Sequence, residues 1–121
     1  MTSYRDLIVW QKSIDLVELI YVLTDALPDS EKYSLSNQMR RAAVSIPSNI
    51  AEGQGRSTSK EFSRFLSVAR GSKHELETQL IICKRLGLLS ERNIAPAMGL
   101  CGEIGRMLNS LMVKISDSSQ N

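Results

Sequence analysis

Aromatic residues, proline, cysteine and histidine are all scarce in this 121-residue chain. Phe, Trp and Tyr together make up 5% of the residues, and there are three prolines, two cysteines and one histidine. No run approaches the roughly 20 apolar residues that a membrane span needs, and the first residues lack the pattern of a secretory signal. We therefore expect a cytoplasmic protein with no membrane partner and a single domain, residues 1–121, built around one core.

The lone histidine and the two cysteines argue against most catalytic and metal-binding sites. His74 opens the segment HELET, which begins like a zinc-protease helix but lacks the second histidine one turn later. Nucleophilic catalysis needs a nucleophile, a base and an orienting group that converge, and one histidine does not indicate them. Cys83 and Cys101 have no metal-binding spacing and fall on apolar stripes, so we expect buried thiols. We expect no metal, no cofactor and no enzymatic activity.

Helical periodicity is what the chain has in abundance. Leu7, Trp10, Ile14 and Val17 alternate steps of three and four, and similar apolar stripes recur along the rest of the sequence. The stripes predict helices over about 5–27, 34–53, 58–87 and 90–115, followed by a disordered tail over 116–121. Connections of a few residues force neighbouring helices to be antiparallel. The predicted fold is all-α, an antiparallel up-down-up-down four-helix bundle.

Several residues mark the expected helix ends. Thr58 and Glu61 fit a capping box, in which each side chain bonds the other residue's amide, and Ser90 can cap the fourth helix. The second helix is expected to stop at Gly53, where a left-handed cap is least costly. Pro47 removes a backbone hydrogen bond inside that helix, so we expect a bend there.

Glycines recur within the predicted helices. Gly99, Gly102 and Gly105 are spaced every three residues, although each costs about 1 kcal/mol relative to alanine in a helix. Close approach of another helix would compensate for that cost. The approaching helix can belong to the same bundle or to another subunit, and the sequence leaves both open.

Basic residues concentrate in the middle of the chain. Residues 36–85 hold nine Lys/Arg against four Asp/Glu, whereas residues 1–35 hold three against six. This asymmetry indicates either an anionic partner or simply a solvated face. The four-residue spacing of three of the cations predicts one shared face at the start of the third helix, and two more precede it. The candidate nucleic-acid-binding residues are Arg40, Arg41, Arg56, Lys60 and Arg64.

If these cations converge, they can contact several phosphates without reading sequence. The chain lacks the interleaved aromatic residues on which exposed bases stack, which disfavours recognition of single strands by stacking. The segment 53–58 resembles a phosphate-binding loop but lacks its Gly-Lys-Ser/Thr triplet, so a helix-capping turn explains its glycines. The amides that begin the third helix can still hold an anion.

A structural role for the arginines is the alternative. A polar seam along the second helix is predicted to contain Arg41, Ser45, Asn49 and Glu52. Glu52 lies at a helix C-terminus, where the helix dipole disfavours a negative charge, so it needs a specific partner. Arg41, Arg56 and a residue of a neighbouring subunit are the candidates.

The segment from Arg40 to Arg56, continued through Gly71 and Ser72, resembles a known family. That family is called four helix bundle proteins or 23S rRNA intervening sequence proteins, the S23 family, and the resemblance runs from Tyr4 to about residue 115. Its reading frames lie within insertions in bacterial 23S rRNA genes. The matching positions are Arg41, Ser45, Ile46, Asn49, Ile50, Ala51, Glu52, Gly53, Gly55, Arg56, Gly71 and Ser72.

The resemblance implies a bacterial four-helix bundle that assembles into a ring, a homopentamer. The similar accessory variability protein of diversity-generating retroelements is associated with nucleic acid and a reverse transcriptase. The net charge of +2 departs from a strongly basic RNA-binding profile. Our first hypothesis is a non-enzymatic, homo-oligomeric protein that binds RNA or DNA through phosphate contacts. The alternative is a self-assembling scaffold that binds another protein.

Overall fold

Four long helices account for most of the structure. The computed structural model describes the backbone of residues 3–120 and the side chains of residues 3–117. The helices are α1 (Ile8–Asp25), α2 (Leu35–Gln54), α3 (Ser59–Arg85) and α4 (Glu91–Gln120), with short 3-10 helices η1 (Tyr4–Asp6) and η2 (Asp29–Glu31). None of the described helices is both long and apolar enough to cross a membrane.

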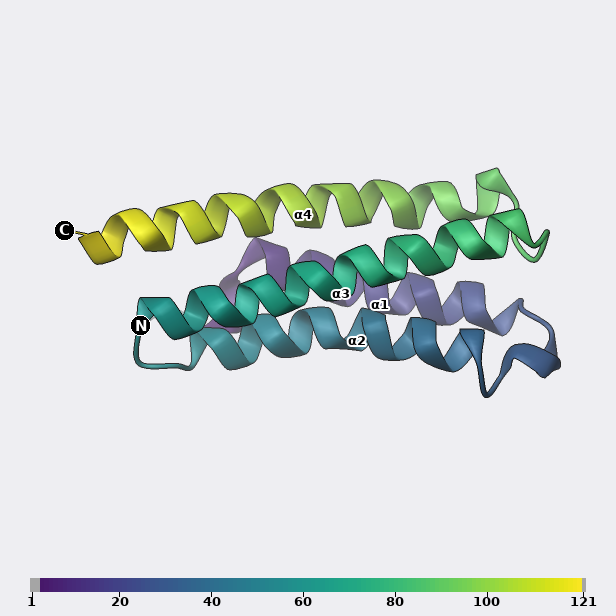
Figure 1. Ribbon diagram of the computed structural model, residues 1–121, viewed down its shortest axis with the longest axis horizontal. Helices are drawn as coiled ribbons and strands as arrows, with labels where there is room; N and C mark the ends of the chain where they lie inside the picture. Colours follow the sequence, from purple (N-terminus) through teal and green to yellow (C-terminus); the bar gives the residue numbers. More distant parts are fainter. Residues whose placement is uncertain (1–2, 121) are drawn as a thin grey trace.

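The helices form a bundle with each one packed against two others. Contacts join α1 to α2, α2 to α3, α3 to α4 and α4 back to α1, so that α1 and α3 are diagonal partners. Successive helices run in opposite directions, and the C-terminal end of α4 projects beyond the other three (Figure 1). No strand is present within residues 3–120. The all-α four-helix bundle predicted from the apolar periodicity is confirmed.

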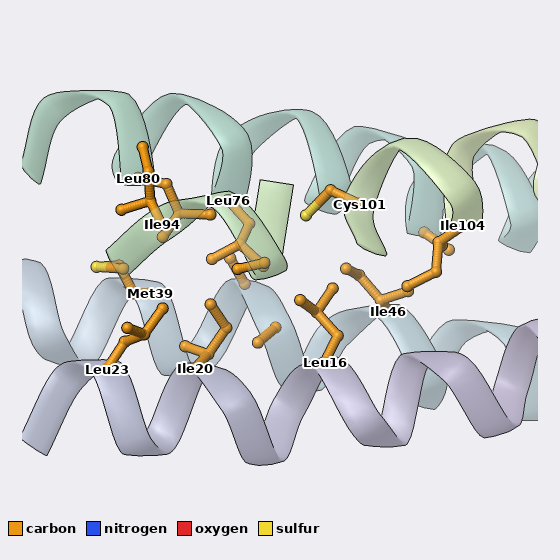
Figure 2. Packing of buried hydrophobic residues seen from close by; sticks show 14 of the residues in the cluster. Leu16, Ile20, Leu23, Met39, Ile46, Leu76, Leu80, Ile94, Cys101 and Ile104 are labelled. Atoms are coloured by element: carbon orange, nitrogen blue, oxygen red, sulfur yellow. The ribbon is translucent and has the colours of Figure 1, made fainter. Parts of the chain in front are cut away.

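Aliphatic side chains from all four helices fill the centre of the bundle (Figure 2). Leu16 and Ile20 of α1 are fully buried, as are the cysteines of α3 and α4, Cys83 and Cys101. The apolar stripes therefore predicted the core, thiols included. Because burial disfavours a thiolate, it raises the pKa of the Cys101 thiol to about 12, and nearby Glu77 adds to the shift.

The first and last helices differ from their predicted spans. Ser3 and Asp6 cap η1 reciprocally, and Leu7 is extended (φ −73°, ψ 123°), so α1 starts at Ile8 rather than near residue 5. At the other end, α4 continues to Gln120, past the expected stop at 115. Polar character led to the expectation of a disordered tail, but residues 116–120 contain no glycine or proline to end the helix. Asn121 lies outside the described residues.

The helix ends use the predicted caps in part. The Thr58 hydroxyl accepts from the Glu61 amide at 3.1 Å, although the reciprocal bond of a capping box is not formed. Ser90 accepts from the Asn93 amide at 3.0 Å and caps α4. The expected left-handed cap at Gly53 is wrong, because α2 runs on to Gln54. Within the described residues only Gly87 has a positive φ, +74°, at the end of α3.

Candidate nucleic-acid interface

The site is built at the turn between α2 and α3, where the two helices approach closely. Gly53 is buried in the last turn of α2, and a Cβ atom there would lie 2.6 Å from Cβ of Phe65. Because Gly53 has no side chain, the first turns of α3 can pack directly against α2. This close approach, rather than a cap, is the reason for a glycine at this position.

Two guanidinium groups lie beside the ring of Phe65. The central carbon of Arg56 and that of Arg64 are each 4.8 Å from the ring centroid, a distance typical of cation–π contact. The two carbons are therefore at most twice that distance apart. Arg56 lies in the turn after α2, not on the third helix as its four-residue spacing from Lys60 suggested. The turn nevertheless brings it beside Arg64.

Arg56, Lys60 and Arg64 form a cationic cluster at the start of α3. Glu52 supplies the only carboxylate bonded to this cluster within the described residues. Its Oε1 accepts from Nη2 of Arg56 at 2.8 Å, one helical turn away. Both side chains are largely exposed, 57% for Glu52 and 41% for Arg56. Glu52 thus pairs with one of its predicted partners, but at the surface instead of in a partly buried seam.

A groove lies next to the cluster, between the start of α3 and the end of α4. It has a volume of about 1100 Å³, and its walls carry four kinds of side chain. The cations are Lys60, Arg64 and Arg70, and the apolar residues are Met112 and Ile115. The remaining lining residues are Thr58, Ser59, Ser63, Ser67 and Ser116, which carry hydroxyls, and Glu61.

The three cations of the groove differ in how firmly they are held. Arg70 donates from Nη1 to Oδ1 of Asn109 on α4 at 2.9 Å, which fixes its guanidinium between the two helices. Lys60 is exposed and makes no hydrogen bond or ion pair with the described residues. Arg64 makes a cation–π contact with the Phe65 ring and no hydrogen bond or ion pair with the described residues. Lys60 and Arg64 are therefore available to an anionic ligand.

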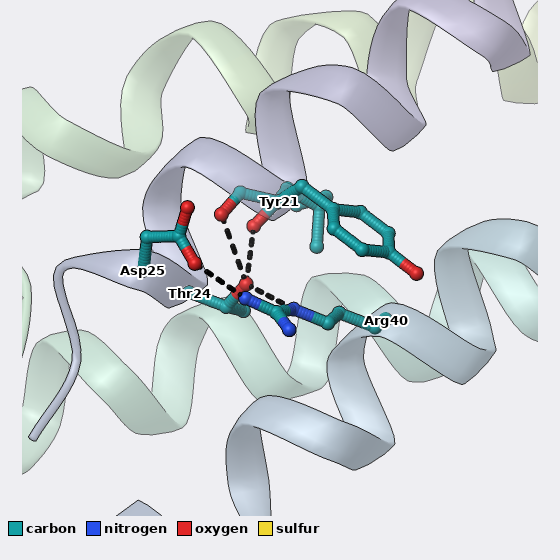
Figure 3. A network of polar contacts seen from close by, with 5 residues as sticks. Tyr21, Thr24, Asp25 and Arg40 are labelled. Atoms are coloured by element: carbon teal, nitrogen blue, oxygen red, sulfur yellow. Dashed lines mark hydrogen bonds and ion pairs between the residues drawn. The ribbon is translucent and has the colours of Figure 1, made fainter. Parts of the chain in front are cut away.

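Arg40 is engaged elsewhere, at the other end of α2. Its Nε donates to Oγ1 of Thr24 and its Nη2 to Oδ1 of Asp25, both at 2.7 Å, and its guanidinium lies over the ring of Tyr21 at 4.6 Å (Figure 3). Three residues of α1 thus hold Arg40. At a rise of 1.5 Å per residue, it lies about 20 Å along α2 from the cluster. It does not converge with Lys60 and Arg64.

The polar seam forms with Ser45 and Asn49 but without Arg41 and Glu52, the two charged residues predicted to belong to it. The hydroxyls of Ser45 on α2 and Ser72 on α3 are 2.8 Å apart, and Nδ2 of Asn49 donates to the carbonyl oxygen of Ser45 at 2.7 Å. Arg41 is exposed and bonds no described residue. Like Arg40, it is about 20 Å from the end of α2 that carries the cluster. Of the five predicted cations, only Arg56, Lys60 and Arg64 are brought together.

The sequence did not predict the positions of two basic side chains of α3. Arg70 belongs to the groove, and Lys73 is 8% exposed, with its Nζ 3.0 Å from Oε1 of Glu77. Lys73 lies over Gly105 of α4, where a Cβ would be 2.9 Å from its Nζ. Residue 73 follows Ala69 by four positions and precedes Leu76 by three, a spacing that could have placed it on the buried face.

Metal-binding groups are not gathered in the described part of the chain. No group of three or more His, Cys, Asp or Glu side chains within it could hold a metal ion. His74 is exposed on α3.

Comparison with known proteins gives the family. The family model described as 23S rRNA-intervening sequence protein matches residues 5–110. The fold is similar to that of a protein of unknown function from the S23 ribosomal protein family of Bacteroides thetaiotaomicron, with a TM-score of 0.81 and 24% sequence identity. The similarity covers 87% of this chain and 98% of that one. No curated protein matches the chain. Because the family model spans most of its length, the chain belongs to the 23S rRNA-intervening sequence protein family.

Proposed function

We propose that this protein is a non-enzymatic, homo-oligomeric bundle that binds RNA or other nucleic acid through phosphate contacts. The observation that carries the proposal is the cluster at the start of α3, where Arg56, Lys60 and Arg64 lie close together. Within the described residues, only Arg56 of these three has a carboxylate partner. Unpaired cations on one face supply the sequence-independent part of nucleic-acid affinity.

The local geometry adds to this attraction. Arg70 lines the same groove as Lys60 and Arg64. The N-terminal end of α3 also borders the groove. Backbone N–H groups and the helix dipole at such an end favour an anion. The nearby Glu61 carboxylate opposes an anion, so we expect phosphates to lie toward the three cations.

Salt dependence of binding tests the proposal. Lys60→Ala combined with Arg64→Ala should weaken binding to unrelated sequences by similar factors. It should also flatten the slope of log affinity against log salt by about one to two units, at roughly 0.9 for each duplex phosphate that a binding subunit no longer neutralises. Fluorescence anisotropy with labelled oligonucleotides over a salt series measures both quantities.

A matched control is available at the other end of the bundle. Arg85→Ala combined with Arg92→Ala removes the same charge from two exposed side chains of α3 and α4. This control should lower affinity much less than the Lys60/Arg64 variant. Equal effects of the two variants would show that only net charge matters and would refute a site at the start of α3.

The proposal of a homo-oligomer rests on the glycines of the outer helix faces. A Cβ added at Gly71 or Gly99 would meet nothing within 4 Å, so close packing inside the bundle does not account for either residue. Gly105, by contrast, accommodates Lys73. We expect five subunits, and light scattering measures the number. A monomer at about 10–100 μM, well above typical subunit dissociation constants, would contradict assembly.

A scaffold that binds another protein is the second candidate, favoured by a groove between α1 and α4. It has a volume of about 370 Å³, and Leu7, Val9, Met107 and Leu111 provide apolar walls. Ile8 at its edge is 53% exposed. Arg106 and Lys114 also line this groove. Binding to its apolar walls should therefore weaken less with salt than phosphate binding, which weakens steeply.

A further inference from the structure

We propose that the groove between α3 and α4 holds a single-stranded polynucleotide, with phosphates on its cationic side chains and a base against its apolar residues. This inference rests on the proposed function and adds which form of nucleic acid the site takes. It also revises the expectation from the sequence, in which the lack of exposed aromatic residues disfavoured single strands.

The shape of the groove is the first argument. The groove is a hollow between two packed helices. The axes of packed helices lie about 8–10 Å apart. A duplex presents its phosphates on a convex surface broader than this separation and can contact only the rim. A single strand can enter. The volume of about 1100 Å³ lies just above the usual range of ligand sites, roughly 300–1,000 Å³, and leaves room for more than one nucleotide.

The arrangement of chemistry in the groove is the second argument. Met112 and Ile115 of α4 provide apolar surface, and a methionine sulfur makes favourable contacts with an aromatic ring such as a base. Arg70, held by Asn109, offers a fixed planar guanidinium that can stack on a base or bind a phosphate. Duplex binding needs neither the apolar residues nor a planar group inside a hollow.

The hydroxyl groups complete the set. Five serine and threonine side chains line the groove, and such hydroxyls both donate to and accept from phosphate, sugar and base edges. Met112 and Ile115 lie after residue 110, where the match to the family model ends. The apolar side of the groove therefore depends on a part of α4 that the family match does not cover.

Filling the groove separates this inference from the proposed function. Ser67 is exposed, so the Ser67→Leu variant should fold normally. Because Ser67 lines the groove, the leucine side chain should occupy the space that the proposal gives to a base. Ser110→Leu is the matched control, because Ser110 is exposed on α4 but lines the other groove. Fluorescence anisotropy would compare oligo(U), oligo(dT) and a duplex of equal length, with circular dichroism to verify folding.

The inference predicts that wild-type protein binds the single strands more tightly than the duplex. Ser67→Leu should weaken single-strand binding about tenfold, the size expected when one base no longer stacks, and should change duplex binding less than about twofold. Ser110→Leu should change neither. Tighter binding of oligo(U) than of oligo(dT) would indicate that the serine and threonine hydroxyls of the groove contact the ribose 2′-OH. Equal binding would indicate that the site accepts either polynucleotide.

Two results would overturn the inference in different ways. If duplex and single strands bind equally, and Ser67→Leu leaves both unchanged while Lys60→Ala with Arg64→Ala weakens both, the groove is refuted and the proposed function stands. If wild-type protein binds none of the three probes at low salt, the proposed function fails and the groove fails with it.

Discussion

Replacing Gly53 with alanine tests the close packing that positions the candidate site. A Cβ at this position would lie 2.6 Å from Cβ of Phe65, 3.1 Å from Cδ1 of Phe62 and 3.3 Å from the Phe62 carbonyl oxygen. The Phe65 Cβ is attached directly to the backbone of α3, so no change of rotamer can move it away. The first turns of α3 must therefore move away from α2.

The expected loss follows from two opposing effects. Overpacking a tight contact costs about 1–3 kcal/mol, whereas alanine is better than glycine in a helix by at most about 1 kcal/mol. Gly53→Ala should therefore lower the free energy of unfolding by up to about 2 kcal/mol relative to wild type, and by about 1–3 kcal/mol relative to a glycine-to-alanine change that meets no neighbour. Gly99→Ala is the same chemical change at a position where nothing lies within 4 Å. It should keep the helical gain and stabilise the isolated bundle by about 0.5–1 kcal/mol.

Urea unfolding followed by circular dichroism measures both variants. Protein concentration must be equal in all samples, because subunit association adds to the apparent stability. If Gly53→Ala is as stable as Gly99→Ala, α2 and α3 do not pack closely at Gly53, and the placement of Phe65 beside two arginines loses its explanation. If the outer face of α4 joins subunits, Gly99→Ala should also weaken assembly in light scattering.

Three further predictions concern other parts of the bundle. Glu52→Ala should lower the free energy of unfolding by at most about 1 kcal/mol, because the ion pair of Glu52 with Arg56 is exposed. A loss of about 2 kcal/mol or more in urea unfolding would contradict a pair confined to the surface. Arg40→Ala should lower the free energy of unfolding by about 1–2 kcal/mol in the same assay, because it removes the hydrogen bonds to Thr24 and Asp25. Arg40→Lys should restore less than half of that loss. An unchanged urea midpoint for Arg40→Ala would refute the link between α1 and α2. Because burial raises the pKa of the Cys101 thiol to about 12, little thiolate is present at pH 8, so iodoacetamide should label Cys101 far more slowly in the folded protein than in urea. Since the Cys101 pKa is 9.0 unfolded and about 12 folded, its stabilising contribution is complete below pH 9 and is lost as pH rises toward 12.

The fold could be predicted because its determinants repeat along the sequence. The three-and-four spacing of residues such as Leu16 and Ile20 defines a buried face whatever the partner helix is. Helix ends were less predictable, because they depend on which tertiary contact a residue makes. Gly53 looked like a cap by sequence, yet it is a contact point with α3, and that contact is invisible to a pattern read along one helix.

The candidate site was predictable only where its residues are close in sequence. Arg56, Lys60 and Arg64 lie within one turn and the start of one helix, so their proximity followed from local spacing. Arg40 shares a helix with none of its bonding partners, and the groove requires Met112 from the far end of the chain. Such long-range pairings depend on the relative placement of helices, which a periodic pattern does not encode.

The distribution of charge reconciles a net charge of only +2 with the proposed phosphate binding. The exposed face of α1 carries Asp15, Glu18 and Asp25, whereas the unpaired Lys60 and Arg64 lie on α3, diagonally across the bundle. Opposite charges on opposite sides cancel in the total but produce a directional field around the molecule. Interactions between exposed charges fade over about 8–10 Å at physiological salt, so a polyanion near α3 is attracted by the cations and little affected by the carboxylates of α1. Binding strength should therefore depend on the charge of the α3 face and not on the net charge of the chain.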